Sequence, residues 1–209
     1  MSYKSYMYYP SHSPIREDPT KHQLLRGALA LALLLVACDM LPTDEFEPTG
    51  SPFSISSNIE VISITGDPDT SLLGPTTAAI KMVSRTSGVE SDTLPAGLLL
   101  RRRSSATQHL LLLKDHRIAA QTSVTKAKLG TFCCNKLRAI PDIGDTFDLG
   151  PITDNAELQQ IVSLVKNKDI SRPLDAFMVQ RAVQMVTDST GLTPAYVESL
   201  NALPADTTD

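Results

Sequence analysis

Residues 58–65 read Asn-Ile-Glu-Val-Ile-Ser-Ile-Thr, and this stretch decides the fold class. It is rich in β-branched residues that partly alternate with polar ones, which is typical of a β-strand with one buried face. The sequence Gly-Asp-Pro-Asp at 66–69 then predicts a turn. After it, apolar residues recur at every second position from Ala78 to Met82, which predicts a second strand over 77–85.

Further apolar segments follow at the short, regular intervals that are common in β-sandwiches. Leucines at 110–113 make both faces of one segment apolar, so we expect that strand to lie centrally in the sheet. The segments are 98–100, 110–113, 118–125, 129–134 and 146–149. Together with the first two strands they predict a β-sandwich-like antiparallel sheet region over residues 58–150.

The last part of the chain has helical periodicity instead. Asp154 or Asn155 can cap a first helix, and Pro173 suits the first turn of a second one. Thr193 can cap a third, short helix. We therefore expect residues 151–209 to form a small helical subdomain and polar tail, in one domain with the sheet. The predicted fold class is α+β.

Composition and charge narrow the range of functions. The 209 residues are 42% hydrophobic and 20% charged, with a net charge of −4, so we expect a folded chain without a nucleic-acid partner. After residue 37 the chain has one tyrosine, Tyr196, and no tryptophan, which disfavours sugar or single-strand sites built on ring stacking. The sequence lacks GxSxG, HExxH, Walker and GxGxxG motifs. We therefore expect a binding or structural module rather than an enzyme, without cofactor or metal.

An apolar run near the N-terminus indicates export. Residues 27–37 are eleven apolar or small residues, which is short for a membrane span of about 20 residues but suits a signal peptide. The tetrad Leu-Val-Ala-Cys at 35–38 resembles the lipobox of bacterial lipoproteins. That resemblance implies removal of residues 1–37 and acylation of Cys38, which would then attach the chain to the membrane. The alternative is a buried hydrophobic helix that ends in cysteine.

The segment after Cys38 predicts a tether. Residues 39–57 are rich in proline, threonine, serine and acidic residues, so residues 38–57 are expected to be the lipidated cysteine and an extended linker. Without residues 1–37 the net charge is −6, so attachment to the membrane should come from the lipid rather than from basic residues. The expected location is the periplasmic face or the cell surface, with an unidentified envelope or extracellular protein as partner.

Three groups of polar residues are candidate sites with ordinary structural alternatives. The histidines of the two middle strands are expected to be surface or sheet residues rather than metal ligands. The three aspartates could offer oxygens to Ca²⁺, but a solvated turn explains them better. The arginine run could bind an anion, but a solvated loop is the favoured interpretation. The residues are His109 and His116; Asp142, Asp145 and Asp148; and Arg101, Arg102 and Arg103.

Adjacent cysteines stand near the end of one predicted strand. Cys133 and Cys134 should point to opposite faces, because side chains alternate along a strand. Bridging them to each other needs a strained turn, so two separate buried thiols is the favoured interpretation. A vicinal disulfide and a bridge to another chain are the alternatives, since disulfides are permitted outside the cytoplasm.

A second resemblance joins these cysteines to a helix. Residues 132–135 read Phe-Cys-Cys-Asn, and residues 179–183 read Val-Gln-Arg-Ala-Val. The pair resembles the aromatic-Cys and Gln-x-Ala motifs of thioester domains in bacterial surface adhesins. The resemblance covers residues 130–188 and implies that Cys133 or Cys134 condenses with Gln180, with Cys133 favoured by the preceding aromatic residue. The two motifs lie closer together here, and valine and glutamine replace the usual threonine and tryptophan.

These observations predict a lipid-anchored, extracytoplasmic binding or structural module of the bacterial envelope. The alternatives are a surface adhesin with an internal Cys–Gln thioester and an envelope enzyme of another type. A buried contact between cysteine and Gln180 would favour the adhesin, and a polar cleft with perturbed titratable groups would favour the enzyme.

Overall fold

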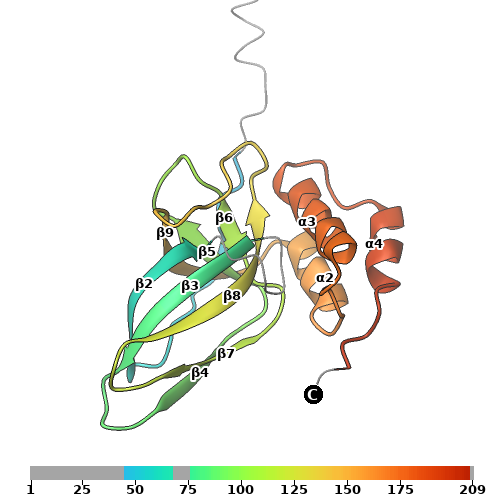
Figure 1. Cartoon of the computed structure of the whole chain (residues 1–209). Helices are drawn as coiled ribbons and strands as arrows, with labels where there is room; N and C mark the ends of the chain where they lie inside the picture. The colour runs from blue at the N-terminus through green and yellow to red at the C-terminus, as the bar shows by residue number, and fades with distance from the viewer. Residues whose placement is uncertain (1–44, 68–75, 208–209) are drawn as a thin grey trace, which may run out of the picture. The chain divides into compact units, whose positions relative to one another are not determined.

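The computed structural model describes residues 45–67 and 76–207, which contain nine β-strands and three helices (Figure 1). They belong to one compact unit, Asp44–Asp209. The strands are β1 Gly50–Ser51, β2 Ile59–Asp67, β3 Thr76–Ser84, β4 Glu90–Leu94, β5 Leu98–Arg102, β6 His109–Leu111, β7 His116–Ala120, β8 Thr125–Cys134 and β9 Thr146–Thr153. The helices are α2 Ala156–Val165, α3 Pro173–Thr187 and α4 Pro194–Asn201.

Six antiparallel strands close into a barrel in the order β9-β2-β3-β8-β6-β5, and β5 pairs with β9 to complete the ring. The α+β class is confirmed, but the expected β-sandwich is wrong. Alternating strands bury one face in either architecture, so the sequence pattern does not distinguish them. Here β9 meets β2 at its beginning and β5 along most of its length, and this double pairing removes the open edges that a sandwich would keep.

The barrel wall is buried on both sides where the helices cover it. Leu110 and Leu112 face the barrel interior, whereas Leu111 and Leu113 pack in the layer between barrel and helices. All four are at most 1% exposed, so the prediction that this segment is apolar on both faces and central is confirmed. In Figure 1 the three helices stand together on one side of the barrel, beside β6 and β8.

The helices begin where the sequence predicts. The Asn155 side chain accepts hydrogen bonds from the first turn of α2, and Thr193 does the same for α4. Pro173 occupies the first turn of α3, where a missing N–H costs nothing. No helix within the described residues is long and apolar enough to cross a bilayer.

The expected tether reaches too far along the chain, because residues 45–57 are part of the folded unit. Phe46 packs against the helix-side core, and Phe53 and Ile55 pack against the barrel core. Strand β1 pairs with the end of β9. The apolar residues of this segment make these contacts. The overall composition, dominated by prolines and polar residues, does not reveal them. Residues 38–44, with Cys38, lie outside the described residues, as does the whole predicted signal peptide.

A small ribbon of β4 and β7 extends from one end of the barrel. Strand β4, Glu-Ser-Asp-Thr-Leu, was not predicted because four of its five residues are polar and only Leu94 is buried. The predicted strand at 118–125 is shifted, since β7 ends at Ala120 and a turn follows.

Candidate functional site

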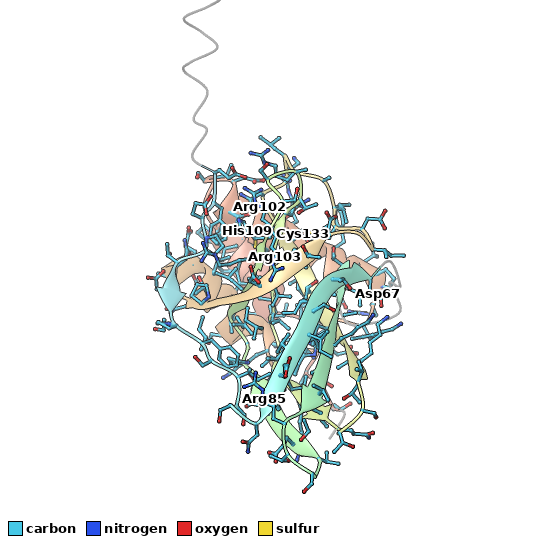
Figure 2. The ribbon with its side chains drawn as sticks, turned by 90° about the vertical axis from the view of Figure 1, so that its left-hand side faces the viewer. Asp67, Arg85, Arg102, Arg103, His109 and Cys133 are labelled. Atoms are coloured by element: carbon cyan, nitrogen blue, oxygen red, sulfur yellow. The ribbon has the colours of Figure 1, made fainter. Side chains whose placement is uncertain are left out.

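Cys133 is the second-to-last residue of β8, and its side chain lies in the barrel core. The residue is 3% exposed, and its Sγ is 3.0 Å from the Thr76 Oγ1 at the start of β3. Thr131, two residues earlier on the same face, donates from its hydroxyl to the Thr76 carbonyl at 3.0 Å and so helps to fix Thr76. Figure 2 shows Cys133 toward the same end of the molecule as Arg102 and His109, with Arg85 toward the other end.

Gln180 lies in the middle of α3 and its side chain reaches the backbone of Cys133. The Cys133 N–H donates to Gln180 Oε1 at 2.8 Å, and Gln180 Nε2 donates to the Cys133 carbonyl at 2.8 Å. The carboxamide thus makes the two bonds that a neighbouring strand would make. Both residues are at least nine-tenths buried, with Gln180 8% exposed. A helix glutamine is therefore held against the predicted cysteine over 47 residues of sequence.

Thr76 and Gln180, the two hydrogen-bond partners of Cys133, lie on the same edge of β8. Strand β3 pairs with β8 up to Thr131, and Thr76 is the residue opposite. On the other edge, Cys133 pairs with Leu110 of β6. The partner of the thiol, Thr76, and the partner of the backbone, Gln180, therefore both lie away from β6.

Cys134 occupies the opposite face, as alternation predicts. It packs in the helix-side core, while Cys133 packs in the barrel core. Both thiols are free, so the vicinal disulfide is not formed in this structure. Burial raises the pKa of the Cys134 thiol well above its usual value, and the described contacts of Gln180 are with Cys133 rather than Cys134.

The Cys133 thiol is protonated at neutral pH. Burial raises its pKa to about 11, and the hydrogen bond with Thr76 opposes this rise only in part. A buried thiol of this kind is a poor free nucleophile, since the thiolate is the reactive form. Any reaction at Cys133 therefore depends on a neighbour that takes the proton and on a partner that is held in contact.

Two residues of the arginine run belong to strand β5, and Arg103 follows the strand in an exposed bend. Arg101 and Arg102 pair with β9, and the Arg103 guanidinium binds Asp148. The Arg102 side chain is only 8% exposed and forms an ion pair with Glu45 at 2.5 Å. Arg102 and Arg103 are thus engaged with carboxylates of the same chain, so the structure gives no support for an anion site built on them.

The three aspartates do not converge. Asp145 accepts from the Asp142 N–H at 2.8 Å within the turn, whereas Asp148 belongs to the ion pair with Arg103. Among the described residues, no three His, Cys, Asp or Glu side chains are grouped in a way that could hold a metal ion. The Asp145 pairing with the backbone agrees with the turn interpretation.

Both histidines lie in strands. His109 is 4% exposed, and its Nδ1 accepts from the Arg102 N–H at 3.2 Å. Its Nε2 has no hydrogen-bond partner in the described part of the chain, and its ring stands edge-on to Phe46. Burial lowers the pKa of His109 to about 4 and also lowers that of His116. His109 is therefore a neutral, buried residue of the sheet at pH 7.

A groove lies on the helical part of the described chain. It has a volume of about 670 Å³ and lies between α2 and α4. Its lining contains Glu198 but no serine, cysteine, histidine, aspartate or lysine. The groove therefore holds no nucleophile with a neighbouring base, and nothing in it favours an enzyme over a binding module.

The sequence predicts that Cys133 and Gln180 lie together but does not predict the contact with Thr76. Thr76 lies 57 residues before Cys133, and no local signal identifies a cross-strand partner at that distance. The partnership follows only from the register of β3 and β8.

Comparisons with known proteins give no identity. Searches of protein-family models, of curated proteins and of solved structures found no significant match.

Proposed function

We propose that this chain is a lipid-anchored covalent binding module of the bacterial cell envelope, with an internal thioester between Cys133 and Gln180. The observation that carries the proposal is the reciprocal pair of 2.8 Å hydrogen bonds between the Gln180 carboxamide and the Cys133 backbone. A contact between these two residues is what the resemblance to adhesin thioester domains implies. Attachment through Cys38 is the other part of the proposal and rests on the lipobox.

The condensation needs no other reactant. The Cys133 Sγ adds to Gln180 Cδ, the bond between Cδ and Nε2 breaks, and the thiol proton leaves on that nitrogen as ammonia. The Gln180 carboxamide is held against the Cys133 backbone and both residues are shielded from water, which brings the two residues of the proposed reaction together before it begins. Thr76 Oγ1, 3.0 Å from Sγ, is the described hydrogen-bond partner of the thiol before the reaction.

The thioester defines the class of partner. A primary amine or a hydroxyl group of the partner attacks Gln180 Cδ, and the Cys133 thiol leaves with a proton. The partner is then joined to the Gln180 side chain by an amide or ester bond. A lysine side chain of an envelope or extracellular protein has the required chemistry.

A second candidate is a non-covalent binding module, and the same hydrogen bonds favour it. They satisfy the N–H and C=O of Cys133 and fasten α3 to the barrel without any reaction. In that case Gln180 is a structural residue and both thiols stay free.

Intact mass distinguishes the two candidates. We expect the purified wild-type protein to be lighter than its sequence by one ammonia, and methylamine to convert it to a heavier adduct on residue 180. Gln180→Ala and Cys133→Ala should abolish both effects. Gln184→Ala, on the same helix, and Cys134→Ala, on the same strand, are the matched controls and should retain them. A wild-type mass equal to the sequence, with two alkylatable thiols after denaturation, would support the non-covalent candidate.

The anchor is tested separately. Globomycin should cause the unprocessed precursor to accumulate, and Cys38→Ala should release the protein from the membrane fraction. Unchanged processing and membrane association in Cys38→Ala would disprove the lipoprotein assignment without affecting the thioester test.

A further inference from the structure

The described chain begins beside one particular loop of the barrel. The β8–β9 loop, residues 135–145, follows Cys133 and Cys134 at the end of β8. Its Arg138 donates from Nε to Glu45 Oε1 and from a terminal nitrogen to Glu45 Oε2, each at 2.9 Å. Arg102, nearly buried, binds the same carboxylate. The double ion pair fixes residue 45 against this loop.

The position of residue 45 limits the distance to the proposed anchor. Cys38 precedes Glu45 by seven residues. A fully extended chain of that length spans at most about 25 Å. This inference rests on the proposed anchor: if Cys38 carries the lipid, the β8–β9 loop is kept within that distance of the bilayer surface.

The same loop exposes large apolar side chains. Leu137 is 94% exposed, Ile140 is 69% exposed and Ile143 is 65% exposed. They are three of the eight large hydrophobic residues that are exposed in the described part of the chain, and they lie within seven positions. Exposed aliphatic groups gathered in this way usually mark a contact surface, because leaving water is favourable for them.

Hydrogen bonds to the barrel fix the backbone of this loop. The Gln108 side chain donates to the Arg138 carbonyl at 2.8 Å, and the Ala139 N–H donates to the Ala106 carbonyl at 3.1 Å. Asp142 and Asp145 bond to backbone N–H groups within the turn. The backbone between the apolar side chains is therefore fastened to the barrel, and their outward exposure is a built feature of the loop.

Charge indicates what kind of lipid surface fits. The loop carries Lys136 and Arg138 against Asp142 and Asp145, so its formal charges balance. Contact with a bilayer would then rely on burial of the aliphatic side chains among the headgroups rather than on attraction to anionic lipid. A zwitterionic membrane is sufficient as the partner.

We propose that the β8–β9 loop is a membrane-contact surface, with Leu137, Ile140 and Ile143 inserted into the interfacial region of the bilayer that carries the Cys38 anchor. The domain then rests on the membrane by this end. Asn135 and Lys136 bond to Thr187 and Asp188 at the end of α3, so the helix that carries Gln180 is fastened to the same loop. Covalent partners would therefore be met near the membrane surface.

The test uses the absence of tryptophan from the sequence. Residues 38–209 are coupled through Cys38 to a maleimide lipid in phosphatidylcholine vesicles, while Cys133 and Cys134 are protected by burial. Leu137→Trp provides one reporter. Val124→Trp is the matched control, because Val124 is 62% exposed and precedes β8, ten residues of strand away from the loop. Figure 1 shows these two ends of β8 at opposite ends of the barrel.

We expect coupling to shift the emission of the Leu137→Trp protein to shorter wavelength and to make it quenchable by brominated lipid. Added salt should leave this quenching unchanged, and Ile140→Ser with Ile143→Ser should weaken it. The Val124→Trp protein should show neither effect. The proposal is overturned if Leu137→Trp keeps the spectrum of the uncoupled protein, or if both reporters are quenched equally. Because the anchor is supplied chemically, neither result depends on processing in the cell or on the thioester.

Discussion

At the scale of single residues, the Gln180 side chain forms the hydrogen bonds with Cys133 that a neighbouring strand would otherwise form. Its carboxamide satisfies two backbone groups of Cys133 that are shielded from water. A buried polar group that loses its partner costs about 1–3 kcal/mol, whereas a satisfied one contributes much less. The structural role of Gln180 can therefore be measured apart from any thioester.

That measurement uses the Cys133→Ala background, in which no thioester can form but the backbone groups remain. Adding Gln180→Ala should lower the free energy of unfolding by about 2–4 kcal/mol, because an N–H and a C=O lose their partner together. Gln184→Ala in the same background should cost less than about 1 kcal/mol. Urea unfolding of the three proteins gives the comparison, and equal midpoints would show that the Gln180 bonds contribute little to stability.

His109 makes stability depend on pH. Its pKa is about 4 in the folded protein, because burial disfavours the charged ring, and about 6.5 in the unfolded chain. Below pH 6.5 the unfolded state takes up a proton that the folded state does not, so stability should fall progressively from pH 6.5 toward pH 4. Replacing His109 by Gln should remove roughly 1 kcal/mol of the loss between pH 7 and pH 5, after solvent screening is allowed for. Thermal or urea unfolding at both pH values tests this, and an identical pH dependence in the His109→Gln protein would contradict it.

At the scale of elements, most boundaries follow from local sequence. Asn155, Pro173 and Thr193 mark the helix starts by capping and by proline geometry. Strand β4 escaped prediction because it pairs only with β7 and has one buried residue, so it lacks the alternation by which strands are recognised. The β3–β8 register, which brings Thr76 to Cys133, is a long-range property that no local pattern contains.

Strand β6 is the most sensitive element to charge. Leu111 is fully buried between the barrel and the helices, so Leu111→Asp would place an unpaired carboxylate in the helix-side core. We expect a loss of several kcal/mol, enough to remove much of a typical domain stability. Leu174→Asp is the control, because Leu174 is 83% exposed on α3 and should tolerate the change. Differential scanning calorimetry should show a large drop in Tm for the first variant and almost none for the second. Similar Tm values would show that Leu111 is not buried in the helix-side core.

At the scale of the whole molecule, the sequence predicts the order of sheet and helices but not barrel closure. Closure depends on the pairing of β5 with β9, which are separated by three intervening strands. Likewise, the proline-rich composition of residues 39–57 does not show that the part from residue 45 onward packs on the folded unit. Glu45, Phe46 and β1 attach that part through residues far along the sequence.

Limited proteolysis should reveal the corrected boundary. We expect the protease-resistant fragment to keep residues 45–57, because these residues pair with β9 and pack on both cores. Replacing Glu45 by Gln removes the charge that Arg102 and Arg138 share and should expose this segment to cleavage. A resistant fragment that begins after residue 57 in the wild-type protein would restore the longer tether.

The thioester is tested most directly by a peptide map of the wild-type protein, digested with trypsin at mildly acidic pH in an amine-free buffer. Cys133 falls in the tryptic peptide 129–136, and Gln180 falls in 169–181. An internal thioester predicts one joined species whose mass is that of both peptides less one ammonia, and which methylamine separates. Recovery of the two peptides unjoined, with Cys133 fully alkylated and Gln180 intact, would contradict the thioester and leave Gln180 as a structural residue.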